Sequence, residues 1–335
     1  MSNKHYSYYM LLFFLVVILF TICCEKEHPT APINADEYTT VKLYDYNYTS
    51  NKYFFIDEVY HKNYEEYLER DRKLTHGYSN SNIIRYLDVY ASAWHSGMSE
   101  ERWSGWAVID PNNLDTSYTS IENVKRYWYK LGINDYTVDA NLGILKLNKQ
   151  IHDSTMLAVA YSDISNNIVG SLSSGSELPN PLILKLLKIE YQTDPIMAWD
   201  LMLRNVYEFN NIYERYPEIS TIRIFYNDVA SLPRDYLETS VGPKTYLEIF
   251  GLDRCGTQGS SDPDGIIDTQ TYFFQFNEDG VIIEFPSLQP FADTTNTLLP
   301  SDKYVKSIYN TCSKSTMMMD TKYYGMSQIK GAKLS

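Results

Sequence analysis

The sequence predicts a mainly β protein, built from two hairpin-rich, β-sandwich-like modules with two or three short helices. The chain carries 31 tyrosines and many Ile, Val and Thr residues, which suit the half-buried faces of strands. Several segments alternate apolar and polar residues, the period of a strand with one buried face. We place the modules at residues 38–165 and 182–335, joined by an exposed Ser-, Asn- and Gly-rich connection at residues 166–181.

An apolar run near the N-terminus has the length of a secretory signal. Met10–Ile22 is continuously apolar but shorter than the roughly 20 residues that a membrane-spanning helix needs. We therefore expect residues 1–24 to be a lipoprotein signal peptide. Residues 25–37 contain two prolines and few large apolar side chains, and are expected to form a tether.

Two adjacent cysteines follow the apolar run. Cleavage before Cys24 leaves the small Cys23 at the preceding position, whereas cleavage before Cys23 would require the bulky Ile22 there. Cys24 is therefore the predicted lipidation site, Cys23 is the less favoured one, and the lipid would link the chain to a membrane. An ordinary cleaved signal peptide is the alternative.

Helical and strand periodicities alternate in the first module. Tyr38–Ile56 alternates loosely and predicts one or two strands. Apolar residues at helical spacing through Val59–Gly77 predict a helix that ends at the glycine, and Ile83–Tyr90 predicts a strand. Asp135–Ser162 contains three alternating runs separated by turns, which predicts a meander.

The second module is predicted to begin with a strand at Leu182–Tyr191. Apolar residues at helical spacing, with Pro195 at the first helical position, predict a helix over Pro195–Tyr207. A strand is expected at Ile219–Asn227. Further on, Asp279-Gly280 separates two alternating runs and predicts a hairpin, because Gly supplies the positive φ of a tight primed turn.

Composition and missing motifs limit the functions that the chain can be expected to have. The net charge is −13 and the chain has no basic block, so we expect no nucleic-acid partner and no attraction to anionic membrane surfaces. The six histidines are scattered without zinc-binding spacing. The chain also lacks a nucleophile elbow, a phosphate loop and a dinucleotide fingerprint. We therefore expect no enzymatic activity.

A loop rich in Asp and Gly in the second module has the composition of a calcium site. Asp262, Asp264 and Asp268 surround Gly265, and short carboxylates around a sharp turn are typical ligands of calcium. Asp253 is a further possible ligand. The alternative is an Asp-Gly loop with a structural role only.

Three tryptophans lie close together in the first module. Trp94, Trp103 and Trp106 could form an aromatic platform for a glycan or a partner protein, whereas packing in the core is the alternative.

Two cysteines remain after the proposed signal. Outside the cytoplasm Cys255 and Cys312 could form a disulfide, and two free thiols are the equally weighted alternative, because spacing alone does not show whether their Cα atoms approach.

Six segments, in the same order along the chain, resemble the SprA (Sov) family, the outer-membrane translocons of the type IX secretion system of gliding Bacteroidetes. These segments are Leu131–Ser162, Pro181–Lys188, Ala198–Phe209, Ile222–Asp228, Phe250–Asp268 and Ile282–Phe291. In addition, Cys24–Glu27 resembles the signal that follows the lipidated cysteine in surface lipoproteins of the Bacteroidetes.

The resemblance implies a mainly β fold, a role in protein secretion and gliding motility, and partners among type IX secretion and outer-membrane proteins. It implies no catalytic residues. The chain has a lipoprotein signal of its own and lacks the long series of membrane-spanning strands of the family's pore. We therefore expect a non-enzymatic lipoprotein of the outer membrane, exposed outside the cytoplasm, that corresponds to an extramembrane module. A surface glycan-binding lipoprotein and a fragment of a split or truncated gene are the alternatives.

Overall fold

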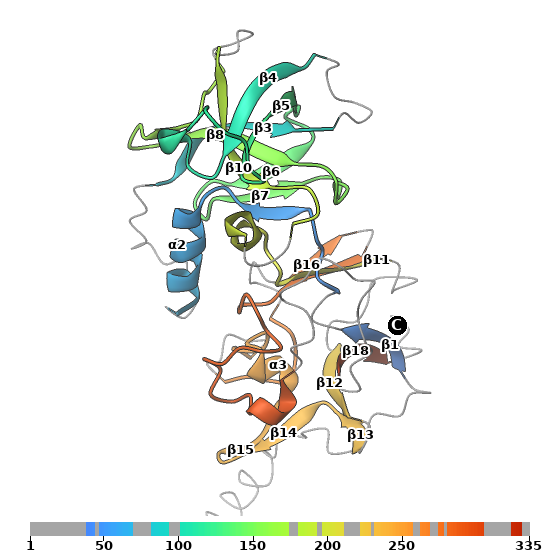
Figure 1. Cartoon of the computed structure of the whole chain (residues 1–335). Coiled ribbons are helices and arrows are strands. Elements are labelled where there is room, and N and C mark those ends of the chain that lie inside the picture. Colours follow the sequence, from blue (N-terminus) through green and yellow to red (C-terminus); the bar gives the residue numbers. More distant parts are fainter. Residues whose placement is uncertain are drawn as a thin grey trace, which may run out of the picture. The chain divides into compact units, whose positions relative to one another are not determined.

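The computed structural model confirms the predicted mainly β class. It describes residues 38–43, 47–69, 82–93, 101–173, 180–192, 196–210, 222–228, 231–256, 262–268, 274–277, 280–304 and 323–329. Strand residues far outnumber helical residues in these ranges, and the strands form several small sheets (Figure 1). No described helix is both long and apolar enough to cross a membrane.

The chain divides into two compact units whose limits differ from the predicted boundary. The central unit spans residues 43–214 and 269–321, and the terminal unit combines residues 1–42, 215–268 and 322–335. The two predicted modules followed one another along the chain, whereas the terminal unit is assembled from three separate stretches. Pairing between strands far apart in sequence produces this division, and such pairing leaves no local pattern.

A closed sheet forms the larger part of the central unit. Its strands are β3 (Ile84–Ala91), β4 (Trp103–Val108), β5 (Asn123–Lys130), β8 (Leu157–Asp163), β9 (Ile168–Val169) and β10 (Leu182–Lys188). The order is β10-β4-β5-β3-β8-β9, and β10 pairs in parallel with β4 and antiparallel with β8, so the sheet closes on itself (Figure 1). The sequence predicts that this segment opens a second module, whereas β10 belongs to the same sheet as β3, β4, β5 and β8.

Apolar side chains fill the interior of the closed sheet. The buried cluster includes Trp128, Ala158, Leu184 and Leu186, and all seven residues of β8 are buried. Gly105 allows the parallel contact between β4 and β10, because a Cβ atom at this position would lie 2.8 Å from the carbonyl oxygen of Leu182. With its interior filled, the closed sheet leaves only its rims and outer faces for binding other molecules.

A three-stranded sheet and a helix adjoin the closed sheet within the same unit. The sheet has the order β2 (Tyr53–Phe55), β7 (Ile144–Leu147) and β6 (Tyr136–Asp139). The predicted meander is therefore divided, because its first two strands lie here and its third, β8, lies in the closed sheet. Helix α2 (Glu58–Glu69) begins one residue before the predicted range and buries Tyr60 and Tyr64 completely.

The third sheet of the central unit confirms the predicted hairpin, although Gly280 lies in the second strand and not in the turn. Strands β16 (Phe274–Asn277) and β17 (Gly280–Glu284) pair with Asn277 opposite Gly280, and β17 also pairs with β11 (Val206–Asn210). Two short 3₁₀ helices of the same unit are η2 (Pro111–Asn113) and η5 (Ser301–Lys303).

The predicted helix over Pro195–Tyr207 is wrong. Only the 3₁₀ helix η3 (Met197–Leu201) forms, and β11 follows it. The intervening backbone bonds to β2 instead, since the Leu203 N–H donates to the Tyr53 carbonyl at 3.0 Å and Met202 forms a bridge with Phe54. Helical spacing of apolar residues does not outweigh these contacts with the neighbouring sheets.

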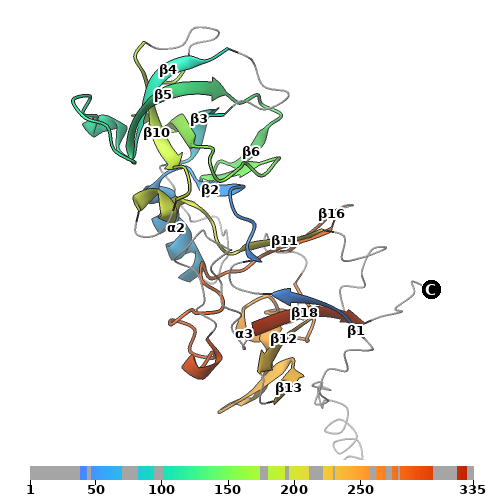
Figure 2. The same ribbon diagram turned by 45° about the vertical axis from the view of Figure 1, so that its right-hand side comes forward.

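In the terminal unit, β12 lies at the centre of a four-stranded sheet. The order is β1 (Tyr38–Leu43), β18 (Tyr323–Ile329), β12 (Arg223–Asp228) and β13 (Ser231–Arg234) (Figure 2). A hairpin of β14 (Tyr236–Thr239) and β15 (Gly242–Thr245) leads into α3 (Tyr246–Ile249), whose first turn carries a capping box.

Aromatic rings bind the helix of the terminal unit to its sheet. The Tyr324 ring of β18 lies 5.1 Å from the ring of Tyr226 and 5.2 Å from that of Tyr246. Phe250 meets Tyr324 edge-on at 4.9 Å, and all four residues are buried. Edge-to-face pairs of this kind add to the free energy gained from burial alone.

A buried polar contact attaches β17 to α2 in the central unit. The Tyr64 hydroxyl donates to Glu284 Oε1 at 2.6 Å and accepts from the Asn205 side-chain amide at 3.2 Å. The Glu284 residue keeps some exposed surface, but its carboxyl group is enclosed, and this burial raises its pKa to about 7. Asp139 adds to the increase by charge repulsion, whereas the bond from Tyr64 opposes it.

Gly143 is predicted to be indispensable for the packing of α2 on the β6–β7 hairpin. Its φ is +62°, and a Cβ atom would lie 2.1 Å from the Tyr60 ring. Gly143→Ala should therefore reduce the free energy of unfolding by about 2–4 kcal/mol, from backbone strain and overpacking. Chemical denaturation measures this loss. Gly132→Ala is the control, because its nearest contact is an Asp135 carboxylate oxygen at 3.2 Å. Equal losses in the two variants would contradict this account.

The raised pKa of Glu284 predicts that stability falls as pH rises. Between its ordinary value of 4.5 and about 7, the folded state holds the Glu284 proton more tightly than the unfolded state does. The free energy of unfolding should therefore decrease across this window by about 1–3 kcal/mol. Glu284→Gln should flatten this part of the pH dependence. A variant whose curve runs parallel to that of the native chain would refute the assignment.

Candidate functional site

A groove of about 590 Å³ in the central unit is the candidate site. Two chain connections line most of it, residues 131–135 between β5 and β6 and residues 147–155 between β7 and β8, and Ala93 completes it. Its volume lies in the range typical of ligand sites. Buried Leu131, Leu147 and Ile151 contribute its apolar part.

Hydrogen bonds fix the two connections to each other. The Asn148 N–H donates to the Asp135 carbonyl at 2.9 Å, and the Asn148 side-chain amide donates to the Asn134 carbonyl at 2.6 Å. Asp135 Oδ2 accepts the Gly132 N–H at 2.7 Å, which closes the first connection on itself. One wall of the groove is therefore shaped before any ligand arrives.

Asn51 and Lys52 hydrogen-bond to the second connection, residues 147–155. The N–H of Leu147 donates to the Lys52 carbonyl at 2.8 Å, and the N–H of Ile151 donates to the Asn51 carbonyl at 3.2 Å. Asn51 adopts a positive φ of 58° and donates its side-chain amide to Asp153 Oδ1. These bonds connect the groove to the strand β2.

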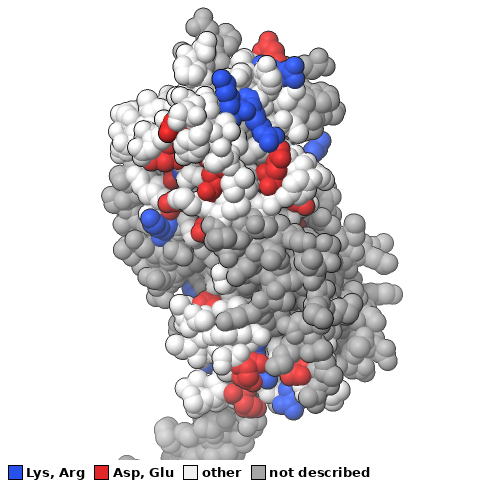
Figure 3. Space-filling model, in the orientation of Figure 1, with Lys and Arg blue, Asp and Glu red and all other residues white. Residues whose placement is uncertain are grey.

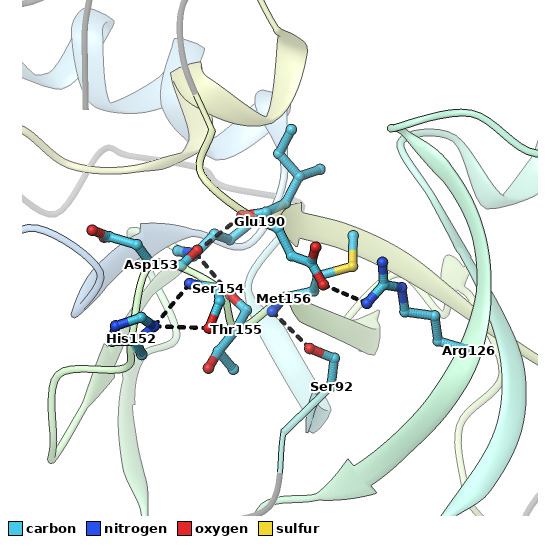
Figure 4. Close-up of polar contacts among 10 residues, drawn as sticks. Ser92, Arg126, His152, Asp153, Ser154, Thr155, Met156 and Glu190 are labelled. Atoms are coloured by element: carbon cyan, nitrogen blue, oxygen red, sulfur yellow. Dashed lines mark hydrogen bonds and ion pairs between the residues drawn. The ribbon is translucent and has the colours of Figure 1, made fainter. Parts of the chain in front are cut away.

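His152, Ser154 and Thr155 belong to one turn that lines the groove, and Figure 4 shows the polar contacts of this turn. The Thr155 N–H donates to the His152 carbonyl at 2.9 Å. The Ser154 N–H donates to His152 Nδ1 at 3.2 Å, and the Ser154 hydroxyl lies 2.7 Å from the same nitrogen. Because Nδ1 accepts, the neutral ring carries its proton on Nε2, which leaves that N–H as a donor.

A buried lysine at the end of β10 holds this turn in place. Lys188 is 1% exposed, and its Nζ donates to the carbonyls of Asp153 at 2.7 Å, Thr155 at 2.8 Å and Ile189 at 3.0 Å. All three ammonium protons therefore have an acceptor, which compensates for burial of the charge.

Further polar contacts surround the turn. The Met156 N–H donates to the Ser92 hydroxyl at 2.8 Å, and Arg126 forms an ion pair with Glu190 (Figure 4). Basic and acidic side chains also lie beside one another elsewhere on the face drawn in Figure 3.

The predicted tryptophan platform does not coincide with the groove. Trp103 and Trp106 lie on β4 three positions apart, so their side chains point to opposite faces of the strand. Trp103 packs against the interior of the closed sheet, and Trp106 is 9% exposed beneath Lys125. Trp94 lies outside the described residues.

The Asp-Gly loop of the terminal unit is organised by hydrogen bonds to carboxylates. Asp253 is 1% exposed and accepts the N–H groups of Asp264 at 3.1 Å and Gly265 at 2.7 Å. Burial raises the pKa of Asp253 to about 6 and also raises the pKa of Asp268, which accepts the Arg254 N–H. Asp262 is exposed.

These hydrogen bonds are the kind that a loop with a structural role requires. In the part of the chain that the structure describes, no three His, Cys, Asp or Glu side chains are grouped to hold a metal ion. The calcium hypothesis for Asp262, Asp264 and Asp268 stays a prediction.

The predicted modification sites receive little structural information. Cys255 is exposed and carries a free thiol. Its predicted partner Cys312, the lipidation candidates Cys23 and Cys24, and the tether at residues 25–37 lie outside the described residues.

Sequence reasoning missed the groove, although a signal for it exists. The sequence assigns residues 135–155 to a meander and predicts no element for residues 131–134. Residues 131–135 come directly before β6. Leu147 is the last residue of β7, and residues 148–151 follow it. The observed pairing of β6 with β7 places Tyr136 opposite Leu147, which brings both segments to the same end of the hairpin.

Comparisons with known proteins give no family for this chain. No protein-family model matches it, and no curated protein matches it either.

Lys188 is predicted to stabilise the wall of the groove. Lys188→Met should leave three carbonyls without their donor and reduce the free energy of unfolding by about 3 kcal/mol. Exchange of the Tyr191 and Thr155 amide protons, which bond to Asp153 and His152, should accelerate more than exchange in β3. Lys62→Met, at an exposed position on α2, is the matched control. Unchanged exchange at both amides would disprove this role.

Proposed function

We propose that the chain is a non-enzymatic lipoprotein of the outer membrane that binds protein components of a type IX secretion machinery. Its binding surface is the groove formed by residues 131–135 and 147–155. In this proposal the chain acts as a binding module that corresponds to an extramembrane part of the SprA family.

One coincidence carries the proposal. The longest segment that resembles the SprA family, Leu131–Ser162, is also the segment that supplies nearly all of the groove lining. A second such segment, Pro181–Lys188, contains the lysine that fixes the groove turn. The resemblance therefore includes the residues that shape a recognition surface, in addition to residues of the core.

The predicted signal peptide and the polarity of the groove agree with this proposal. The apolar run Met10–Ile22 followed by Cys24 predicts export and lipid attachment. The groove combines an apolar part with several exposed polar side chains, the composition by which proteins recognise partners with specificity.

Photocrosslinking in the source cells tests this function. A photoreactive amino acid at position 149, on the groove, should give adducts that mass spectrometry identifies as type IX secretion components. The same amino acid at position 118, exposed in the connection between β4 and β5, should give few or none. A known lipoprotein of that machinery is the positive control. If it forms adducts and position 149 gives none, the proposal fails.

A further inference from the structure

We infer that the outer face of strands β4 and β5 binds an acidic polysaccharide. This inference goes beyond the proposed function, and the residues involved differ from those that line the groove. Ala107, Val124 and Trp128 belong to the interior of the closed sheet, so the alternate residues of both strands face outward. The exposed residues that face outward define the cationic face, which comprises Arg102, Ser104, Lys125 and Tyr127.

Two contacts between a cation and an aromatic ring lie next to each other on the cationic face. Trp106 pairs with Lys125 across the two strands, and the neighbouring pair on the same face joins Ser104 to Tyr127. The Arg102 guanidinium lies 4.6 Å from the centre of the Tyr127 ring. The Lys125 ammonium lies 5.7 Å from the centre of the Trp106 ring. A cation held over a ring in this way keeps N–H donors for an anionic ligand.

The charge of this face is positive. The outward-facing positions described on the two strands include Arg102 and Lys125 but no Asp or Glu. Glu101 occupies the alternate position before Arg102 and already has a contact of its own. Beside β4, Lys185 of β10 is matched by Asp57 at 3.2 Å. Although the whole chain has a net charge of −13, charges beyond about 8 Å are largely screened at physiological ionic strength. The face therefore attracts an anion at close range.

An exposed ring among these cations favours a sugar polymer. Tyr127 is 55% exposed, although the Arg102 guanidinium lies over its ring. An aromatic ring can stack on a sugar ring, and the hydroxyl of Ser104, opposite Tyr127, can exchange hydrogen bonds with sugar hydroxyls. A polymer with a carboxylate on each sugar offers acceptors to both cations and a ring to Tyr127. Nucleic acid also combines charge with flat rings, but two cations neutralise too few phosphates to hold it.

Two tetrasaccharides test the inference on the purified chain without its signal peptide. Calorimetric titration at physiological salt should detect binding of tetragalacturonate, which carries a carboxylate on every sugar, and much weaker binding of neutral cellotetraose. The double substitution Arg102→Ser with Lys125→Ser should weaken tetragalacturonate binding about tenfold. The matched control, Lys62→Ser with Lys149→Ser, removes two exposed charges elsewhere and should leave the affinity unchanged.

A ring substitution separates a sugar from other anions. Tyr127→Ser should weaken tetragalacturonate binding, whereas Tyr118→Ser, which removes an exposed ring from the connection between β4 and β5, should not. Equal losses in the matched variants, equal affinity for the two tetrasaccharides, or absence of binding would each overturn the inference. A tetraglutamate peptide that binds as tightly as tetragalacturonate would also overturn it, because the face would then select an acidic protein segment. Crosslinking at position 149 tests the proposed function separately, so the two failures are distinguishable.

Discussion

Closure of the sheet by β10 is the constraint on which the central unit depends. One face of this strand contributes Leu184 and Leu186 to the interior, and its two edges pair with β4 and β8. Both edges of β10 are thereby occupied, whereas β3 and β5 pair only through Tyr90 with Lys130 and Ala91 with Tyr129. The candidate groove lies at connections next to these strands, residues 131–135 and 147–155.

The same strand links the core to the groove. Where β10 ends, Lys188 points its ammonium group at the carbonyls of the His152–Thr155 turn. Lys185, also on β10, lies 3.2 Å from Asp57. The Asp57 carboxylate accepts two further hydrogen bonds, from the Glu58 N–H at the start of α2 and from the Tyr161 hydroxyl. Two lysines thus organise polar contacts around an otherwise apolar strand. A binding surface made of loops gains rigidity from such contacts, because backbone bonds alone fix loops less firmly than strands.

Local patterns in the sequence were sufficient to predict those helices and strands that form mainly through interactions between neighbouring residues. The Asp-Gly turn predicted the β16–β17 hairpin, and periodicity predicted β3 and α2. Periodicity gave wrong or incomplete predictions where the structure depends on pairing between segments that are far apart in the sequence. The residues after η3 have helical spacing but bond to β2, and β10 joins β4 through a parallel pairing with no local signal. The groove depends on the pairing of Tyr136 with Leu147. This register brings residues 131–135 and 147–155 together, and the sequence pattern does not specify it.

The topology of the terminal unit has a consequence for the order in which the chain folds. Its sheet places β1, near the start of the described chain, next to β18, near the end, and β18 also pairs with β12 (Figure 2). The central unit can form from residues that emerge earlier, whereas the aromatic cluster around Tyr324 must wait for the last stretch. During synthesis, the terminal unit therefore completes last, and its unpaired strands stay accessible to chaperones or to aggregation until then.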